Sequence, residues 1–321
     1  MGQQRTFAGL AWDRKKKVTR REGFLAEMNA AVPWRDVLAV VMPKYPAPAR
    51  GRGVMPLEQM LRIYFCQQWF NLSDPAMEDA LYDSESIRRF VGIELGDEAV
   101  PDETTILRFR HLLEAHALTE TLFETVNALL EQKGLMVKRG TIVDATILHA
   151  PSSTKNATAT RDPEMRQTRK GKQWYLGMKV HTGTSLRGLV HAIHTTDAAQ
   201  ADITQLVGLL SGEEKVLYGD QAYWSEGHRA MLEAHGIAFR VNRRGTKAYP
   251  LTEYEKKINR ARSRRRAWGE HPYHTIKCLW GFTKVRYRGL KKNTVRVFAA
   301  FMLANLFRVR KKLRPGWATC L

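Results

Sequence analysis

The sequence predicts an α/β protein with a mixed sheet, preceded by an all-α N-terminal region. In the first part of the chain apolar side chains recur at helical spacing, as at Leu57, Leu61 and Tyr64. After Gly134, short β-branched runs alternate with helical segments, which is the pattern of an α/β domain. We therefore divide the chain into a helical region 1–135, an α/β domain 136–313 and a tail 314–321.

The helical region begins after a loose basic arm over residues 1–18. Thr19 stands three residues before Glu22, a capping-box pattern that starts a helix ending near Ala31. Residues 43–56 are rich in Pro, Gly and Arg and read as a linker. Further helices are expected over 33–41, 57–70, 87–91, 101–116 and 118–133. Another is expected to start where Ser73 precedes Asp74 and Pro75. Such bundles include DNA-binding modules, and a bundle that only packs on the next domain is the equal alternative.

The α/β domain is expected to hold strands at 136–137, 141–146, 215–218 and 237–241. A hairpin over 175–182 and 188–195 would turn at Gly183-Thr184-Ser185. The polar segment 151–172 reads as a mobile loop. Helices are expected over 201–210, 225–235, 259–277 and 294–312.

Composition points to a polyanionic partner. The 321 residues carry a net charge of +20, and the pI is near 10.1, which favours nucleic acid over a membrane surface. No apolar run approaches the ~18 residues of a spanning helix, so we expect no membrane association. The three cysteines are too far apart for a zinc ribbon or a disulfide framework. These features predict a soluble intracellular protein.

Positive charge is concentrated near the C-terminus. Residues 256–314 hold nineteen Lys or Arg and a single carboxylate, Glu270. On a helix, Glu270 would share one face with Arg262, Arg266, His274 and Lys277. Taken alone, Glu270 is best explained by an ordinary salt bridge with Arg266. The alternative is a metal ligand set beside cations that hold a phosphate backbone.

Two aspartates strengthen the second interpretation. Asp144 lies inside a β-branched strand, where a buried carboxylate is costly unless it is paired or bound to metal. Asp220 ends a short strand, the position at which open α/β sheets place ligand-binding groups. A solvent-facing Asp144 and a turn-forming Asp220 are the alternatives. Three converging carboxylates would suit Mg²⁺, and two ions ~4 Å apart would suit phosphodiester cleavage.

With the acids Asp144 and Asp220 and the spacing of Arg266, Glu270 and Lys277, the chain resembles a DDE transposase of the bacterial insertion-sequence-five family over nearly its whole length. The family's signature, Arg, three residues, Glu, six residues and Lys, is met by Arg266, Glu270 and Lys277. Ser263 replaces the Tyr of that signature, and Gln221-Ala222 departs from the usual residues after the second Asp. Other matching pieces are 101–105, 108–110, 143–146, 150–156, 161–165, 177–181, 219–223 and 285–290.

This resemblance implies a ribonuclease H-like catalytic domain in which Asp144, Asp220 and Glu270 are both catalytic and metal-binding, with two Mg²⁺ ions as cofactors. It implies strand cleavage and strand transfer on double-stranded DNA, with the helical region at the terminal inverted repeats. A homodimer would hold the two ends, and the protein would be cytoplasmic and nucleoid-associated. The DNA-binding residues expected from the basic helix and from the strand beside Asp144 are Arg262, Arg264, Arg265, Arg266, Lys277 and Lys179.

Other residues are weaker candidates. His191 and His194 would point to opposite faces of a strand, which disfavours a histidine metal site with His181. Asp202 is better explained as a helix cap. Base stacking or core packing would account for Trp224, Trp268 and Trp280. Two rival functions stay open, namely a nuclease of the same fold without joining activity and an inactive, transposase-derived DNA-binding regulator.

Overall fold

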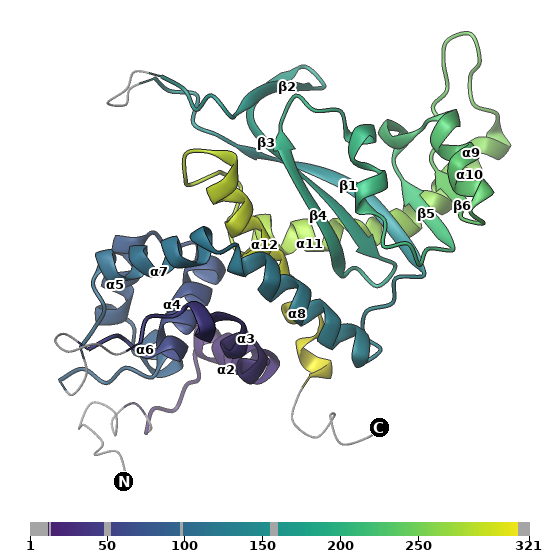
Figure 1. The fold of residues 1–321 in the computed structure, drawn as a ribbon. Coiled ribbons are helices and arrows are strands. Elements are labelled where there is room, and N and C mark those ends of the chain that lie inside the picture. Colours follow the sequence, from purple (N-terminus) through teal and green to yellow (C-terminus); the bar gives the residue numbers. More distant parts are fainter. Residues whose placement is uncertain (1–11, 13, 48–52, 97–98, 155–159, 314–321) are drawn as a thin grey trace.

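The computed structural model describes residues 12, 14–47, 53–96, 99–154 and 160–313, and Figure 1 traces its fold. The predicted tail 314–321, most of the predicted N-terminal arm and part of the predicted linker lie outside the described residues. The same holds for Lys155 and Asn156 of the matching motif.

The N-terminal part of the chain is helical, as predicted. Thr19 and Glu22 form the expected capping box, and the side chain of Asp102 caps its helix by accepting from the Thr105 N–H. A 3₁₀ turn, η1, covers Met42–Lys44. The helices are α2 (Arg20–Ala31), α3 (Trp34–Val41), α4 (Leu57–Phe70), α5 (Asp74–Asp83), α6 (Glu85–Val91), α7 (Glu103–Ala115) and α8 (Leu118–Gln132).

The remainder is built on one mixed sheet. Its strands lie in the order β2-β3-β1-β5-β6, and β4 also pairs with β3. β1 pairs antiparallel with β3, which pairs antiparallel with β2 and β4, whereas β1, β5 and β6 run parallel. This is a ribonuclease H-like arrangement and confirms the predicted fold class. The strands are β1 (Gly140–His149), β2 (Arg166–Lys170), β3 (Gln173–Ser185), β4 (Val190–Asp197), β5 (Val216–Gly219) and β6 (Ala238–Val241).

Several predicted details of this part were wrong. Strand β2 lies inside the predicted loop 151–172, where its sequence Arg-Gln-Thr-Arg-Lys shows no apolar alternation because it is exposed at the sheet edge. The β3–β4 turn falls after Ser185, since β3 continues through the predicted turn. No strand forms at 136–137. The predicted helix 201–210 consists of two 3₁₀ turns, η2 (Asp202–Gln205) and η3 (Val207–Leu209).

The basic stretch is not one helix. After the 3₁₀ turn η4 (Gln221–Tyr223), helix α9 (Glu226–Ala234) and β6, helix α10 runs over Glu253–Arg266. A 3₁₀ turn, η5 (Ala267–Gly269), then leads into the short helix α11 (Glu270–His274) and the π-helical turn η6 (Thr275–Leu279). The predicted continuous helix 259–277 is therefore interrupted directly before Glu270. Such irregular turns are often found at functional sites.

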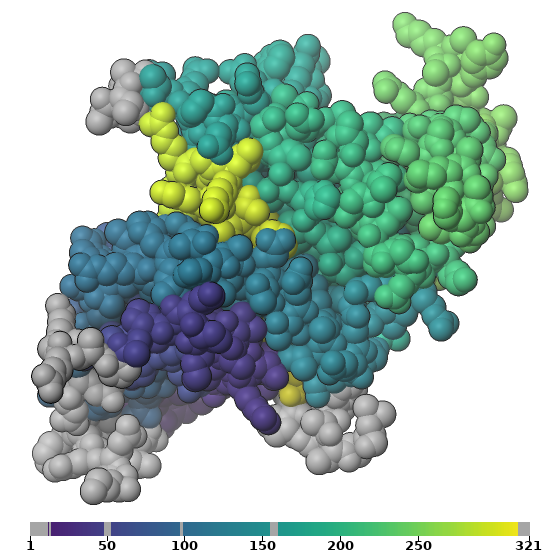
Figure 2. Space-filling model, in the orientation of Figure 1, coloured from purple at the N-terminus to yellow at the C-terminus, as the bar shows by residue number. Residues whose placement is uncertain are grey.

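Helix α12 (Leu290–Val309) joins the two halves of the molecule and is followed by η7 (Arg310–Lys312). Figure 2 shows this yellow segment between the blue helical region and the green sheet region. Its buried side chains belong to one apolar core that also includes the N-terminal helices and one face of the sheet. A smaller cluster around Leu217 and Tyr223 covers the other face. Although α12 is 20 residues long, no helix in the described residues is long and apolar enough to cross a membrane.

Candidate active site

Strand register brings Asp144 and Asp220 together at one end of the sheet. β1 and β5 are parallel, with Ile142 opposite Tyr218, so two residues further along each strand Asp144 comes level with Asp220. β5 ends at Gly219, whereas β1 continues to His149. Asp144 therefore lies on the part of β1 that extends beyond the carboxyl end of β5. Open α/β sheets bind ligands at the carboxyl ends of their strands.

Glu270 reaches this place because its helix packs closely on β1. A side chain at Gly269 would come within 2.8 Å of the Ile142 Cγ2 atom, so only glycine allows this approach without a shift. The buried Tyr273 hydroxyl donates a 3.0 Å hydrogen bond to the backbone carbonyl of Asp144. It pairs with the Thr182 hydroxyl at 2.7 Å. Helix α11 is thus fixed to β1 at the residue that carries the first acid.

Arg266 connects the first and third acids. Its Nη1 atom lies 3.6 Å from Asp144 Oδ2, and its Nη2 atom lies 3.3 Å from Glu270 Oε1. The Arg266–Glu270 salt bridge considered from sequence is therefore present. The pKa of Asp144 is raised to about 6, first by burial and then by the charges of Asp220 and Glu270, against the opposing charge of Arg266. The charges of Asp220 and Glu270 therefore act on Asp144.

The donor chemistry of this site fits a hard divalent cation. Asp144, Asp220 and Glu270 offer only oxygen ligands, and the crowded negative charge would be relieved by a cation. In the described part of the chain, no three His, Cys, Asp or Glu side chains are grouped closely enough to hold a metal as they lie. Asp220 Oδ1 accepts the Ala222 N–H at 2.8 Å, and the Arg266 guanidinium stands between the other two acids. Metal binding at all three acids therefore requires side-chain movement.

The six cations predicted to bind DNA fall into two groups. Arg264 and Arg265 are exposed at the end of α10. The other four have partners in the chain. Arg266 is held by the acids, and Lys277 donates to the Ile147 carbonyl at 2.7 Å. Arg262 donates to the Val241 carbonyl at 2.6 Å, and Lys179 is paired with Asp202 at 2.9 Å.

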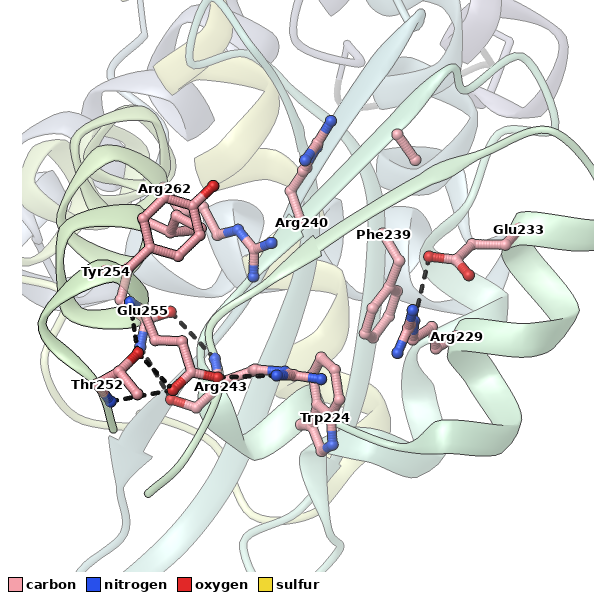
Figure 3. A pocket seen from close by; sticks show the side chains of 13 residues that line it. Trp224, Arg229, Glu233, Phe239, Arg240, Arg243, Thr252, Tyr254, Glu255 and Arg262 are labelled. Carbon is pink, nitrogen blue, oxygen red and sulfur yellow. Dashed lines mark hydrogen bonds and ion pairs between the residues drawn. The ribbon is translucent and has the colours of Figure 1, made fainter. Parts of the chain in front are cut away.

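An arginine-rich pocket lies at the β6 edge of the sheet, where Ala238, Phe239 and Arg240 contribute to its lining. It has a volume of about 590 Å³, and Figure 3 shows Arg243 extending from Glu255 toward the Trp224 ring. The Arg243 guanidinium lies 5.4 Å from the centroid of that ring. Burial first, and then the charges of the neighbouring arginines, lower the pKa of Arg262. This crowding of positive charge favours an anionic ligand. The residues that line the pocket include Trp224, Arg229, Arg240, Arg243, Tyr254 and Arg262.

A buried polar group behind the acids was not predicted from the sequence. The Tyr223 hydroxyl is buried, and among the described residues it has no hydrogen-bond partner. Burial and the charges of Tyr273, Asp202, Asp144 and Asp220 raise its pKa well above the usual range. Its position three residues after Asp220, in the motif at 219–223, was the available signal. The prediction that Asp202 caps a helix was wrong, because Ala201 holds the cap position without a side-chain hydrogen bond. Asp202 instead pairs with Lys179 and lies 3.8 Å from His181 Nδ1.

Three of the remaining candidates, His181, His191 and Trp280, have hydrogen-bond or packing partners within the protein. His181 is fully buried and its Nε2 lies 3.0 Å from the Thr196 hydroxyl. His191 pairs with the Thr141 hydroxyl at 3.0 Å. Trp280 is buried in the core beside Phe307. By contrast, Trp268 is 41% exposed, and a surface role remains open to it.

Comparison with known proteins identifies the family of this chain. The family model of the transposase DDE domain matches residues 136–306, and a second model, described as a transposase domain (DUF772), matches residues 12–112. Among solved structures, the Mos1 strand transfer complex is 14% identical over 95% of this chain and 98% of that one, with a TM-score of 0.27. The Mos1 transposase paired-end complex with the left transposon end is 12% identical over 94% and 98%, also with a TM-score of 0.27. Similarity at that score carries no weight beside the family match. The transposase DDE domain model matches more than half of the residues of this chain. The chain therefore belongs to the transposase DDE domain family and is a DDE-type transposase.

Proposed function

We propose that this transposase binds the terminal inverted repeats of an insertion sequence of the insertion-sequence-five type. It would cut and join DNA strands in a Mg²⁺-dependent reaction at Asp144, Asp220 and Glu270. The observation that carries the proposal is the β1–β5 register, which brings the two aspartates level beside the helix that begins with Glu270. The three acids come from three separate segments of the chain, and their charges act on the same carboxylate, Asp144.

In this mechanism the three carboxylates hold the cofactor, and the chain positions the DNA. Bound Mg²⁺, as one or two ions, would activate the attacking water or 3′-hydroxyl and stabilise the leaving oxygen. Tyr273 keeps the Asp144 backbone in place by its hydrogen bond. Lys277, on the π-helical turn, donates to the Ile147 carbonyl of β1, the strand that also carries Asp144. Its ammonium group would face an approaching phosphate there.

Two surfaces would bind the DNA backbone. Arg264 and Arg265 project from the end of α10, and the same helix contributes Arg262 to the lining of the arginine-rich pocket. Both surfaces lie in the half of the molecule that carries the acids. We assign the helical region, residues 1–135, to binding of the inverted repeats and to dimerisation, with residues 136–313 as the catalytic domain. A homodimer associated with the nucleoid would bring the two ends together.

Substitution of single acids tests the cutting site. Asp220→Asn should reduce cleavage of a plasmid carrying the element ends by at least about a thousandfold, because several kcal/mol of transition-state stabilisation are lost. Binding of the same ends, measured by fluorescence anisotropy, should change little. The control is Glu226→Gln, which neutralises an exposed carboxylate on α9. Normal cutting by Asp220→Asn would refute the assignment of the three acids.

Joining needs a separate assay, because a nuclease of the same fold would also cut. The wild-type protein should transfer pre-cleaved ends into a second plasmid, whereas a nuclease would only degrade them. If cleavage occurs and transfer does not, the protein is a nuclease. If neither reaction occurs while the ends are bound, it is an inactive DNA-binding regulator.

A further inference from the structure

Arg266 lies at the centre of the acidic site, between two of its carboxylates. Its two terminal nitrogens lie 3.6 Å from Asp144 and 3.3 Å from Glu270. The guanidinium is 23% exposed, and Asp144 is 16% exposed. In the described structure, the Arg266 Nε atom is buried without a hydrogen-bond partner. The guanidinium is therefore held there by charge more than by an optimal set of hydrogen bonds.

We propose that Arg266 is a positioning residue that holds Asp144 and Glu270 together as an internal cation and must withdraw when a metal ion takes these carboxylates. The inference rests on the proposed function, because it takes the three acids as the metal site. It adds that the metal affinity of the protein is limited by its own arginine. The guanidinium that withdraws is then free to contact a DNA phosphate.

The physical reason is competition for the same oxygens. A divalent ion coordinates carboxylate oxygens at 2.0–2.6 Å, roughly, so a metal shared by Asp144 and Glu270 leaves no room for a guanidinium between them. The two cations would also repel each other strongly at such a distance, because part of the site is buried. Arg266 has a path outward, since it ends α10 next to the exposed Arg264 and Arg265.

The opposite interpretation is that Arg266 supports the metal site. In that case its removal would let the two acids move apart and would weaken metal binding. The two interpretations predict opposite signs for one measurement. Metal affinity therefore decides between them without any assay of catalysis.

The experiment is a titration of the full-length protein with Mn²⁺, followed by electron paramagnetic resonance of the free ion. Arg266→Gln should bind Mn²⁺ more tightly than wild type by between about 5- and 150-fold, the usual range for coupling between two ligands. Arg265→Gln removes the same charge from the next residue and should change the affinity by less than about threefold. Arg266→Lys keeps a positive charge with fewer contacts and should lie between wild type and Arg266→Gln.

Each outcome separates this inference from the proposed function. Equal or weaker Mn²⁺ binding by Arg266→Gln, in a variant whose thermal unfolding is still cooperative, would overturn the inference. If Arg266→Gln unfolds, Arg266→Lys takes its place. Equal or weaker Mn²⁺ binding by that variant, compared with wild type, would then overturn the inference. Asp144→Asn serves as the test of the site itself. If it leaves Mn²⁺ binding unchanged in both backgrounds, the metal site is elsewhere and the proposed function fails as well.

Discussion

The arginines of the interior and those on the surface of the sheet half serve different purposes, although the sequence shows both as parts of one basic protein. Arg110 of α7 is 6% exposed, and Arg296 of α12 is 3% exposed. Arg110 is paired with Asp74 at 2.9 Å and with Glu114 at 2.7 Å. In the sheet half, Arg240, Arg264 and Arg265 are exposed. Net charge alone therefore overstates the surface available to DNA.

The joint between the halves shows why arginine is used in the interior. Arg286, in the loop after the π-helical turn, donates to the Asn71 carbonyl at 2.8 Å and also to the Leu72 carbonyl. Arg296 of α12 donates to the Asn71 side chain at 2.6 Å. A guanidinium offers five donors in a rigid plane, so it can satisfy several carbonyl oxygens at the end of α4. These contacts connect the segment after Lys277 to the helical region.

The largest effect expected from this difference is on stability. Arg110→Ala should lower the free energy of unfolding by about 3–5 kcal/mol, because two largely buried carboxylates, Asp74 and Glu114, lose their partner. Arg265→Ala, on the exposed end of α10, should change it by less than about 0.5 kcal/mol. Urea denaturation of both variants measures the contrast. Similar losses in the two variants would contradict the division into interior and surface arginines.

The next effect is on DNA affinity. Replacing Arg240 and Arg243 with glutamine should reduce the salt dependence of binding by ~0.9 in the logarithmic slope for each phosphate that the variant no longer neutralises. Arg310→Gln is the control, because Arg310 is paired with Glu27 at 2.7 Å and does not line the pocket. Anisotropy titrations over a range of salt concentrations give the slopes. An unchanged slope in the double variant would exclude the arginine-rich pocket from the DNA interface.

The smallest effect concerns acid stability. Burial lowers the pKa of His191 from 6.5 to about 4. Its folded-state pKa lies below the unfolded one, so stability present above pH 6.5 is lost as the pH falls toward 4. His191→Gln should therefore show a flatter loss of stability across this window than wild type. The exposed His116→Gln is the control, and the measurement is the unfolding midpoint at each pH.

Local signals allowed much of the fold to be predicted. The capping box at Thr19 and the cap at Ser73 were found because they are local patterns. Asp144 and Asp220 were selected as candidates because a carboxylate is unusual inside a strand and because strand ends often carry ligand-binding groups. Strand β2 was missed because an exposed edge strand needs no apolar alternation.

Features that depend on tertiary packing could not be predicted. The break before Glu270 follows from the contact of Gly269 with Ile142, which lies more than a hundred residues earlier in the chain. The buried roles of Arg110 and Arg296 depend on partners in other elements, so a count of charges could not reveal them. The apolar residues on all sides of Arg296, Val295 and Val297 among them, were the one hint that this arginine is interior.

The central claim is that Asp144, Asp220 and Glu270 form one metal site, and iron-directed cleavage of the protein tests it most directly. Fe²⁺ bound in place of Mg²⁺, with ascorbate and peroxide, cuts the polypeptide close to its ligands. We predict fragments that end near residues 144, 220 and 270, suppressed by excess Mg²⁺ and weakened in Asp144→Asn. Cuts confined to other segments, or a pattern that Asp144→Asn leaves unchanged, would contradict the claim.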